Sequence, residues 1–429
     1  MTHSMLAESR GRTTRTGWLD RQRRTTAATL VGLAALVALV ALAVVAGACG
    51  GGSPTTAPTV TITVGPSSSA SGSPSASAGT STHAATAQLV IAAAGGPRAN
   101  GISVISASGK VKQLVPAVGG PIRDLAWAPD GQRLAFLRAV SETDSTSSLF
   151  VYNVPRKLLY QVGAGVTPAT IESFAWLGST QLVESYFPVG ATTYHANGTL
   201  YVRDIAKSSG EAVKNSAGHV VKGVGVSSSA DGVHLAYVTY GAKSSGTIAE
   251  SLRVYDADDL SVTTVASGSA PTQDDGDQFT YPAISPDGSL IAAEQTGSDI
   301  GFGLTVYGTD GAKHLQTGSL LWPAPVSWTS HGPRLAYGGG STVDASTDSD
   351  ALNVSAPGAG KTRRILTVGK LPITSLAWTP KATQIAYAVA KESGLQSALW
   401  VVNADGSNRH LLLAGGSWPA WAVAPVRFP

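Results

Sequence analysis

The sequence predicts an all-β fold, a seven-bladed β-propeller, and three observations support this prediction. First, a unit of apolar strand, tight turn and second apolar strand recurs along the chain, centred on Trp or an equivalent residue: Trp127, Trp176, Ser228, Ile284, Trp328, Trp378 and Trp421. Second, the units are 43 to 56 residues apart, near the repeat length of roughly 40–50 residues that is typical of propeller blades. Third, Gly (49) and Pro (23) are abundant, and strong helix signals are scarce after residue 50.

The elements of one blade are clearest in the unit around Trp127. An apolar strand over 122–127 is followed by the turn Pro129-Asp130-Gly131 and by a second strand over 134–137. Pro presets the first corner of the turn, Asp can bond to its own backbone, and Gly accepts a positive φ. A polar loop then leads to an outer hairpin, which begins at Ser148. Inner strands are apolar on both faces because a blade packs on each side, whereas outer strands alternate.

The two ends of the repeat region complement each other. The last unit, residues 415–425 (GGSWPAWAVAP), supplies an inner strand without an outer hairpin. The first units, from Ala87 and Gly101, supply a second strand and an outer hairpin without an inner strand. Together they make one complete blade, shared between the N- and C-terminal ends. Ring closure of this kind hides sheet edges that would otherwise promote aggregation. We therefore expect residues 87–429 to form one propeller domain.

The repeat resembles that of the TolB-type family of WD-like propellers over residues 87–424. The turns at 128–131 (APDG) and 285–288 (SPDG) match the family pattern, and the turn at 229–232 (SADG) is close to it; others are degenerate. The resemblance implies a propeller in a membrane-anchored bacterial envelope protein. TolB itself has an α/β domain ahead of six blades, whereas this chain has a spacer there, so the resemblance does not extend to TolB's place in an outer-membrane complex.

The N-terminus is predicted to anchor the chain. Residues 1–24, with six Arg, are expected to be a cytoplasmic basic segment, and residues 25–48 a transmembrane helix or a lipoprotein signal. The run 27–48 is almost wholly apolar, and about 20 such residues span a hydrocarbon core. Ala46-Gly47-Ala48 ahead of Cys49 resembles a bacterial lipobox, which makes Cys49 a candidate lipidation site. A retained helix, a lipoprotein and a cleaved, secreted form remain as alternatives.

Residues 49–86 consist largely of Gly, Ser, Thr, Pro and Ala, which predicts a disordered, flexible linker. Six of the 30 basic and two of the 27 acidic residues precede residue 49, so the remainder has 24 basic and 25 acidic residues and a net charge of −1. This charge predicts no nucleic-acid partner. The expected location is the cell membrane, with the propeller on the extracytoplasmic side.

The sequence predicts no cofactor and no catalytic residue set. The single cysteine, Cys49, excludes an intrachain disulfide and a cysteine-based zinc cluster. Asp274, Asp275 and Asp277 are candidate calcium ligands, although the EF-hand pattern is absent. No G-x-S-x-G nucleophile motif occurs.

Function is expected in the loops at one end of the ring and in the central channel. The longer insertions are at 140–147, 187–198, 241–250, 268–279 and 341–350. Tyr186, Phe187 and Tyr194 are candidate partner contacts of one loop, since aromatic residues often carry interface energy. The leading hypothesis is a non-enzymatic binding or scaffold propeller of the cell envelope, with a protein or small-ligand partner. The alternative is a hydrolase or lyase acting on carbohydrate or lactone substrates, with carboxylates from several blades meeting at the channel.

Overall fold

The computed structural model describes residues 88–95, 101–116, 119–139, 147–162, 169–188, 195–205, 210–244, 246–271, 279–297, 301–317, 325–330, 332–339, 350–369, 371–390, 397–424, 426 and 428. The predicted segments 1–24, 25–48 and 49–86 lie outside these residues. Among the described residues, no helix is long and apolar enough to span a membrane.

The described residues form an all-β propeller of antiparallel sheets, with one short 3-10 turn at Pro357–Ala359. Five sheets have four strands each. In sheet order they are β28 (Gly416–Ala424), β1 (Gln88–Gly95), β2 (Ile102–Ser106) and β3 (Val111–Val115); β4 (Ile122–Trp127), β5 (Arg133–Ala139), β6 (Ser147–Asn153) and β7 (Leu158–Gln161); β16 (Phe279–Ile284), β17 (Leu290–Gly297), β18 (Gly301–Gly308) and β19 (Lys313–Gln316); β20 (Val326–Trp328), β21 (Leu335–Gly338), β22 (Asp350–Ala356) and β23 (Lys361–Gly369); β24 (Ile373–Trp378), β25 (Gln384–Ala390), β26 (Ser397–Asn403) and β27 (His410–Ala414).

The remaining strands form one eight-stranded sheet. They are β8 (Ala169–Leu177), β9 (Gln181–Pro188), β10 (Gly198–Asp204), β11 (Gly210–Ala212), β12 (Lys222–Ser228), β13 (His234–Ser244), β14 (Thr247–Asp256) and β15 (Val262–Pro271). We call β8–β11 its first half and β12–β15 its second half; β10 joins them by pairing with β12, with Gly198 opposite Gly223. A Cβ on either glycine would collide with a neighbouring aromatic ring, Phe187 or Tyr237. Glycine at both positions thus permits β10 and β12 to pair, so these eight strands form one sheet. The other five sheets are separate from it.

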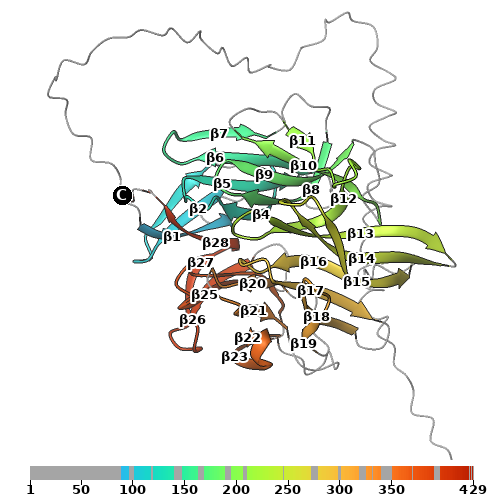
Figure 1. Cartoon of the computed structure of the whole chain (residues 1–429). Coiled ribbons are helices and arrows are strands. Elements are labelled where there is room, and N and C mark those ends of the chain that lie inside the picture. Colours follow the sequence, from blue (N-terminus) through green and yellow to red (C-terminus); the bar gives the residue numbers. More distant parts are fainter. Residues whose placement is uncertain are drawn as a thin grey trace, which may run out of the picture. The chain divides into compact units, whose positions relative to one another are not determined.

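The predicted closing sheet is confirmed. β1 pairs with β28 from Gln88 opposite Ala424 to Gly95 opposite Gly416, so the first and last described strands lie side by side (Figure 1). Gly95 has a φ of +94°, and a Cβ there would collide with the carbonyl of Gly415. The inner strands contact one another in chain order from β4 to β28, and β28 also contacts β4, which closes the ring.

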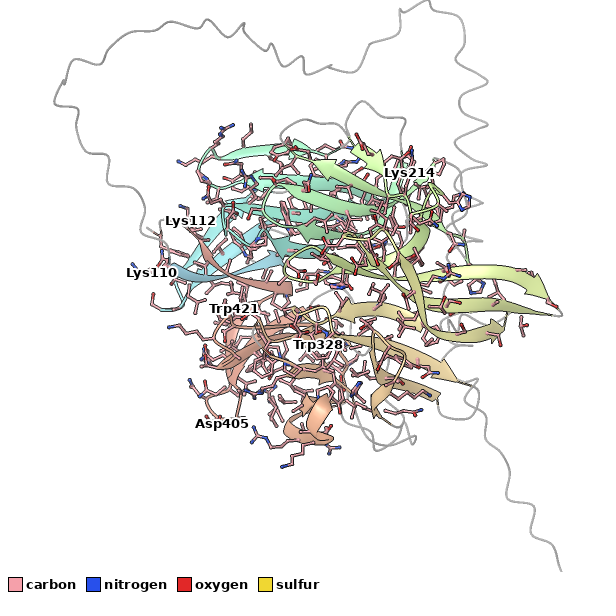
Figure 2. The ribbon with its side chains drawn as sticks, in the orientation of Figure 1. Lys110, Lys112, Lys214, Trp328, Asp405 and Trp421 are labelled. Atoms are coloured by element: carbon pink, nitrogen blue, oxygen red, sulfur yellow. The ribbon has the colours of Figure 1, made fainter. Side chains whose placement is uncertain are left out.

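The Trp residues of the repeat connect neighbouring sheets. Three of them donate the indole Nε1–H to a backbone carbonyl on the inner strand of the preceding sheet: Trp127 to Ala420 (3.1 Å), Trp176 to Ala126 (3.1 Å) and Trp328 to Ala283 (2.8 Å). Figure 2 shows Trp328 and Trp421 among the side chains packed between sheets, whereas Lys110 and Lys112 lie at the margin. The Nε1 atoms of Trp378 and Trp421 are buried without a hydrogen-bond partner among the described residues.

The prediction of a loop at 241–250 is wrong. β13 continues to Ser244 and β14 begins at Thr247, and these two residues pair across the hairpin. The turn between them includes Gly246, whose φ of +83° is a conformation that glycine adopts without strain. Figure 1 shows β13, β14 and β15 reaching outward beyond the neighbouring strands.

Candidate functional site

Most of the residues predicted to carry function lie outside the described part of the chain. Cys49, Tyr194 and the candidate calcium ligands Asp274, Asp275 and Asp277 are all in that group. No group of three or more His, Cys, Asp or Glu side chains that could hold a metal ion occurs among the described residues.

Tyr186 and Phe187 lie in β9 and not in a loop, which corrects the predicted boundary. Phe187 is 2 % exposed and packs in the core of the second half with Val224 and Phe279. Tyr186 is half-buried, and its ring meets that of Tyr201 edge-on at a centroid distance of 5.3 Å. The strand continues to Pro188 because Thr170 and Ala169 of β8 still pair with it. The two residues therefore do not form an exposed aromatic patch.

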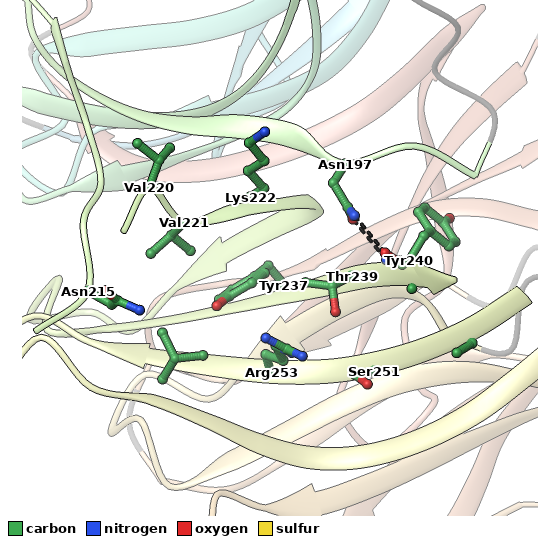
Figure 3. Close-up of a pocket in the computed structure, with 13 residues that line it drawn as sticks. Asn197, Asn215, Val220, Val221, Lys222, Tyr237, Thr239, Tyr240, Ser251 and Arg253 are labelled. Atoms are coloured by element: carbon green, nitrogen blue, oxygen red, sulfur yellow. Dashed lines mark hydrogen bonds between the residues drawn. The ribbon is translucent and has the colours of Figure 1, made fainter. Parts of the chain in front are cut away.

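A cavity of about 530 Å³ lies where the two halves of the eight-stranded sheet meet. We call it the β13–β14 pocket, because the side chains of those two strands form its floor (Figure 3). Tyr237 stands directly opposite Arg253 in the strand register, and Thr239 stands opposite Ser251. Alternate residues of a strand share one face, so these four side chains project together from the sheet.

The connection between β11 and β12 forms one wall of the pocket. Asn215 Oδ1 accepts the backbone N–H groups of Ala217 (3.1 Å) and His219 (2.9 Å), and Gly218 takes a φ of +78°. This tight turn brings Val220 and Val221 over the floor. Because its oxygen is occupied, Asn215 directs its Nδ2 group toward Tyr237 (Figure 3).

A second wall is fixed by Asn197, which precedes β10. Its Nδ2 donates to the carbonyl of Tyr240 (2.7 Å), and its Oδ1 accepts the N–H of the same residue (2.8 Å). A side-chain amide that makes both bonds to one backbone unit cannot rotate freely. The edge of the pocket is therefore held in place before any ligand arrives.

The pocket has a positive electrostatic character. Arg253 and the exposed Lys222 line it, and the described residues that line it include no carboxylate and no imidazole. The Nε atom of Arg253 is buried without a hydrogen-bond partner among the described residues. Burial raises the pKa of Tyr237 to about 12, with the Arg253 charge opposing the rise, so the phenol is neutral at physiological pH.

Two carboxylates interact on neighbouring inner strands, away from this pocket. Burial raises the pKa of Asp124 to about 6; the bond that it accepts from the N–H of Leu125 (2.8 Å) lowers it, and the charge of Glu172 raises it. Glu172 Oε2 in turn accepts the N–H of Gly225 from the next inner strand (2.9 Å). Both carboxylates therefore already bond to the backbone.

No protein-family model matches the chain, and no curated protein sequence matches it. Solved structures of similar fold include TolB from Acinetobacter baumannii, at 13 % identity and a TM-score of 0.43, with 78 % of this chain and 66 % of TolB covered. An oligogalacturonate lyase from Vibrio parahaemolyticus shares 11 % identity at a TM-score of 0.48, with 77 % and 87 % covered. The tricorn protease shares 9 % identity at a TM-score of 0.46, with 76 % and 33 % covered.

TolB is among the solved structures of similar fold. The others include a lyase and a protease. Propellers host unrelated functions, and identities this low do not assign one.

Proposed function

We propose that the protein is a binding or scaffold propeller, tethered to the cell membrane with its propeller on the extracytoplasmic side. The observation that carries the proposal is the composition of the β13–β14 pocket. Among the described residues that line it, the ionisable side chains are cations and phenols: Lys222, Arg253, Tyr237 and Tyr240. Acid–base catalysis requires a group whose pKa lies near the working pH, and Tyr237, with a pKa of about 12, is not such a group. The side chains of the pocket therefore suit the binding of a ligand better than proton transfer to or from that ligand.

The tether rests on the sequence. The apolar run 27–48 supports a membrane anchor, and the six Arg ahead of it support a cytoplasmic N-terminus. Both a retained helix and a lipidated Cys49 would place residues 87–429 outside the cell, and neither nucleic acid nor a cofactor is required.

We also infer that the ring counts seven blades. The eight-stranded sheet supports this count because each of its halves is a meander of four strands, like the separate sheets. The side chains of the eight-stranded sheet also belong to two different hydrophobic clusters, as expected for two blades. Val183 and Leu200 of the first half meet Leu235 of the second in one cluster, whereas Val238 and Leu252 pack toward Ile291 of the next sheet.

Crosslinking and co-purification from membranes test the proposed function. The full chain would be one bait, and a chain truncated after Thr86 would be the control that keeps the anchor and loses the propeller. We expect the full chain alone to capture a defined protein or to retain a small molecule identified by mass spectrometry. Identical recovery with both baits would contradict a binding role for the propeller.

A hydrolase or lyase acting on carbohydrates or lactones is the second candidate. It is favoured by Asp124 and Glu172, because carboxylates from adjacent blades interact and the pKa of Asp124 is about 6, a value suited to acid–base catalysis. A screen of oligosaccharides and lactones with the full chain would test it. Turnover that disappears in Asp124→Asn would establish the enzyme, and absence of turnover would favour the binding module.

A further inference from the structure

Among the described residues, Arg253 is the arginine whose buried Nε atom has no hydrogen-bond partner. Arg203 pairs with Glu184, and Arg133 pairs with Asp130 at 2.9 Å. Arg409 stacks over the ring of Trp400 at 4.5 Å. Burying a guanidinium nitrogen without an acceptor costs free energy that a bound acceptor would recover. Because Arg253 also lines the pocket, an acceptor bound there can reach its guanidinium group and offset part of this cost.

The polar groups around Arg253 can each donate a hydrogen bond. The register places the Tyr237 phenol opposite it, and Ser251 precedes it on the same face of β14. Asn215 adds an amide Nδ2 from the opposite wall (Figure 3). A planar guanidinium binds carboxylate and phosphate oxygens through two parallel bonds, and neighbouring O–H and N–H groups can bond to the remaining oxygens.

The size of the pocket indicates a small molecule. A volume of about 530 Å³ is within the range of about 300–1,000 Å³ found for small-molecule sites. Beside the polar floor, Val221, Val262 and Ala249 supply apolar surface, which an inorganic ion would leave uncovered. The occupant that fits is an anion with an organic body.

We propose that the β13–β14 pocket binds a small organic anion, whose carboxylate or phosphate group is held by Arg253. This inference rests on the proposed binding function and names the chemical class of the ligand. The body of the ligand lies against Val221 and Val262, and its hydroxyl groups bond to Thr239 and Ser251.

Isothermal titration calorimetry on the full chain in detergent would test the proposal with three probes of one scaffold. D-glucose 6-phosphate carries a phosphate, D-glucuronate carries a carboxylate, and D-glucose carries no charge. We expect at least one anion to bind at least tenfold more tightly than glucose, and the comparison of the two anions identifies the preferred head group. Equal affinities for all three probes, or no binding of either anion, would overturn the proposal.

Substitutions of Arg253 test whether this residue is responsible for anion binding. Arg253→Gln should weaken binding of the preferred anion at least tenfold, and Arg253→Lys should restore part of it. Arg334→Gln is the matched control, because Arg334 is exposed and lies over Trp378 of another sheet. Wild-type affinity in Arg253→Gln would overturn the assignment. If Arg253→Gln does not fold, Thr239→Asp, which offers Arg253 an internal carboxylate, should lower anion affinity in its place.

Failure of this inference can be told apart from failure of the proposed function. Capture of a partner by the full chain without anion binding would overturn the anion site alone. Anion binding without any protein capture would support the site and limit the binding role to a small ligand.

Discussion

The two halves of the eight-stranded sheet use an arginine in opposite ways. In the first half, Glu184 of β9 reaches Arg203 of β10, and the pair is almost wholly buried, at 0 % and 4 % exposure. In the register, Glu184 lies two residues beyond Leu182, which stands opposite Arg203. In the second half, Tyr237 stands opposite Arg253, and the residue at the same offset is Thr239, which has no carboxylate. The difference of one carboxylate decides whether the cation is neutralised within the protein or faces a cavity.

This comparison separates charges that stabilise the fold from charges that are available to a ligand. Burial raises the pKa of Glu184, and the charge and hydrogen bond of Arg203 oppose that rise. A buried pair of this kind is costly to break because the remaining partner keeps its desolvation penalty. Arg253 has no such internal partner among the described residues, so its removal should affect binding more than stability.

The largest expected effect follows from breaking the pair in the first half. Glu184→Gln should lower the free energy of unfolding by about 3 kcal/mol, because Arg203 would remain buried without a counter-charge. Urea unfolding of the full chain, followed by tryptophan fluorescence, measures this change. Glu211→Gln, on the exposed face of β11, is the control. A loss in Glu184→Gln no larger than in that control would mean that the ion pair contributes little.

Copying the arrangement of the first half into the second should weaken ligand binding. Thr239→Asp places a carboxylate on the floor of the pocket, near Arg253, and should weaken anion binding at least tenfold, or about 1.4 kcal/mol. Titration with D-glucose 6-phosphate and D-glucuronate would measure the loss. Thr239→Ser, which keeps the hydroxyl, should bind as the wild type does; unchanged affinity in Thr239→Asp would contradict the comparison.

Asp124 is a third case: unlike Glu184, which lies beside an arginine, it lies beside another carboxylate, Glu172. The pKa of Asp124 is raised from 3.8 to about 6, so its contribution to stability is complete below pH 3.8 and is lost as the pH rises through about 6. Asp124→Asn has no such titration and retains the positive φ of 56° that Asn tolerates.

We therefore expect the stability of Asp124→Asn relative to the wild type to rise by about 2 kcal/mol between pH 4 and pH 7.5, because a pKa raised from 3.8 to about 6 corresponds to about 3 kcal/mol, part of which is already lost at pH 4. Urea unfolding at a series of pH values gives both quantities. Parallel stability curves for the two proteins between pH 4 and 7.5 would show that Asp124 does not titrate with a raised pKa.

The smallest expected effect concerns the stability of the second half. Arg253→Met should change the free energy of unfolding by less than about 1 kcal/mol, because no internal ion pair is lost. Arg203→Met, measured by the same urea unfolding, is the matched comparison and should cost about 3 kcal/mol. Equal losses in the two variants would show that Arg253 is a structural residue.

The sequence was sufficient to predict the blade pattern because its signals are local. The turn at Pro129-Asp130-Gly131 forms as expected: Gly131 has a φ of 65°, and Asp130 Oδ1 accepts the N–H of Gln132 (2.9 Å). The pairing of β1 with β28 was predictable from the complementary ends of the repeat. The joining of β10 to β12 was not, because it depends on the approach of Gly198 and Gly223, which no local pattern encodes.

The pocket was missed because it depends on long-range placement. Its floor requires the register between β13 and β14, and its wall requires the turn at Asn215 to lie over that floor. One local feature of the sequence could have indicated the pocket: an outer strand has the charged residue Arg253 at the position where the preceding hairpin has Tyr201. The predicted loop residues Tyr186 and Phe187 were misplaced because their strand, β9, continues beyond the usual length of about 5–6 residues.

The pairing of β1 with β28 has a mechanical consequence. Gln88 lies opposite Ala424, so the chain enters the propeller and leaves it at the same end of this strand pair. A force that pulls residue 88 away from residue 424 therefore loads the ladder from its end, one hydrogen-bonded pair after another, as in opening a zipper. At each moment the force is borne mainly by the hydrogen-bonded residue pair at the open end of the β1–β28 ladder.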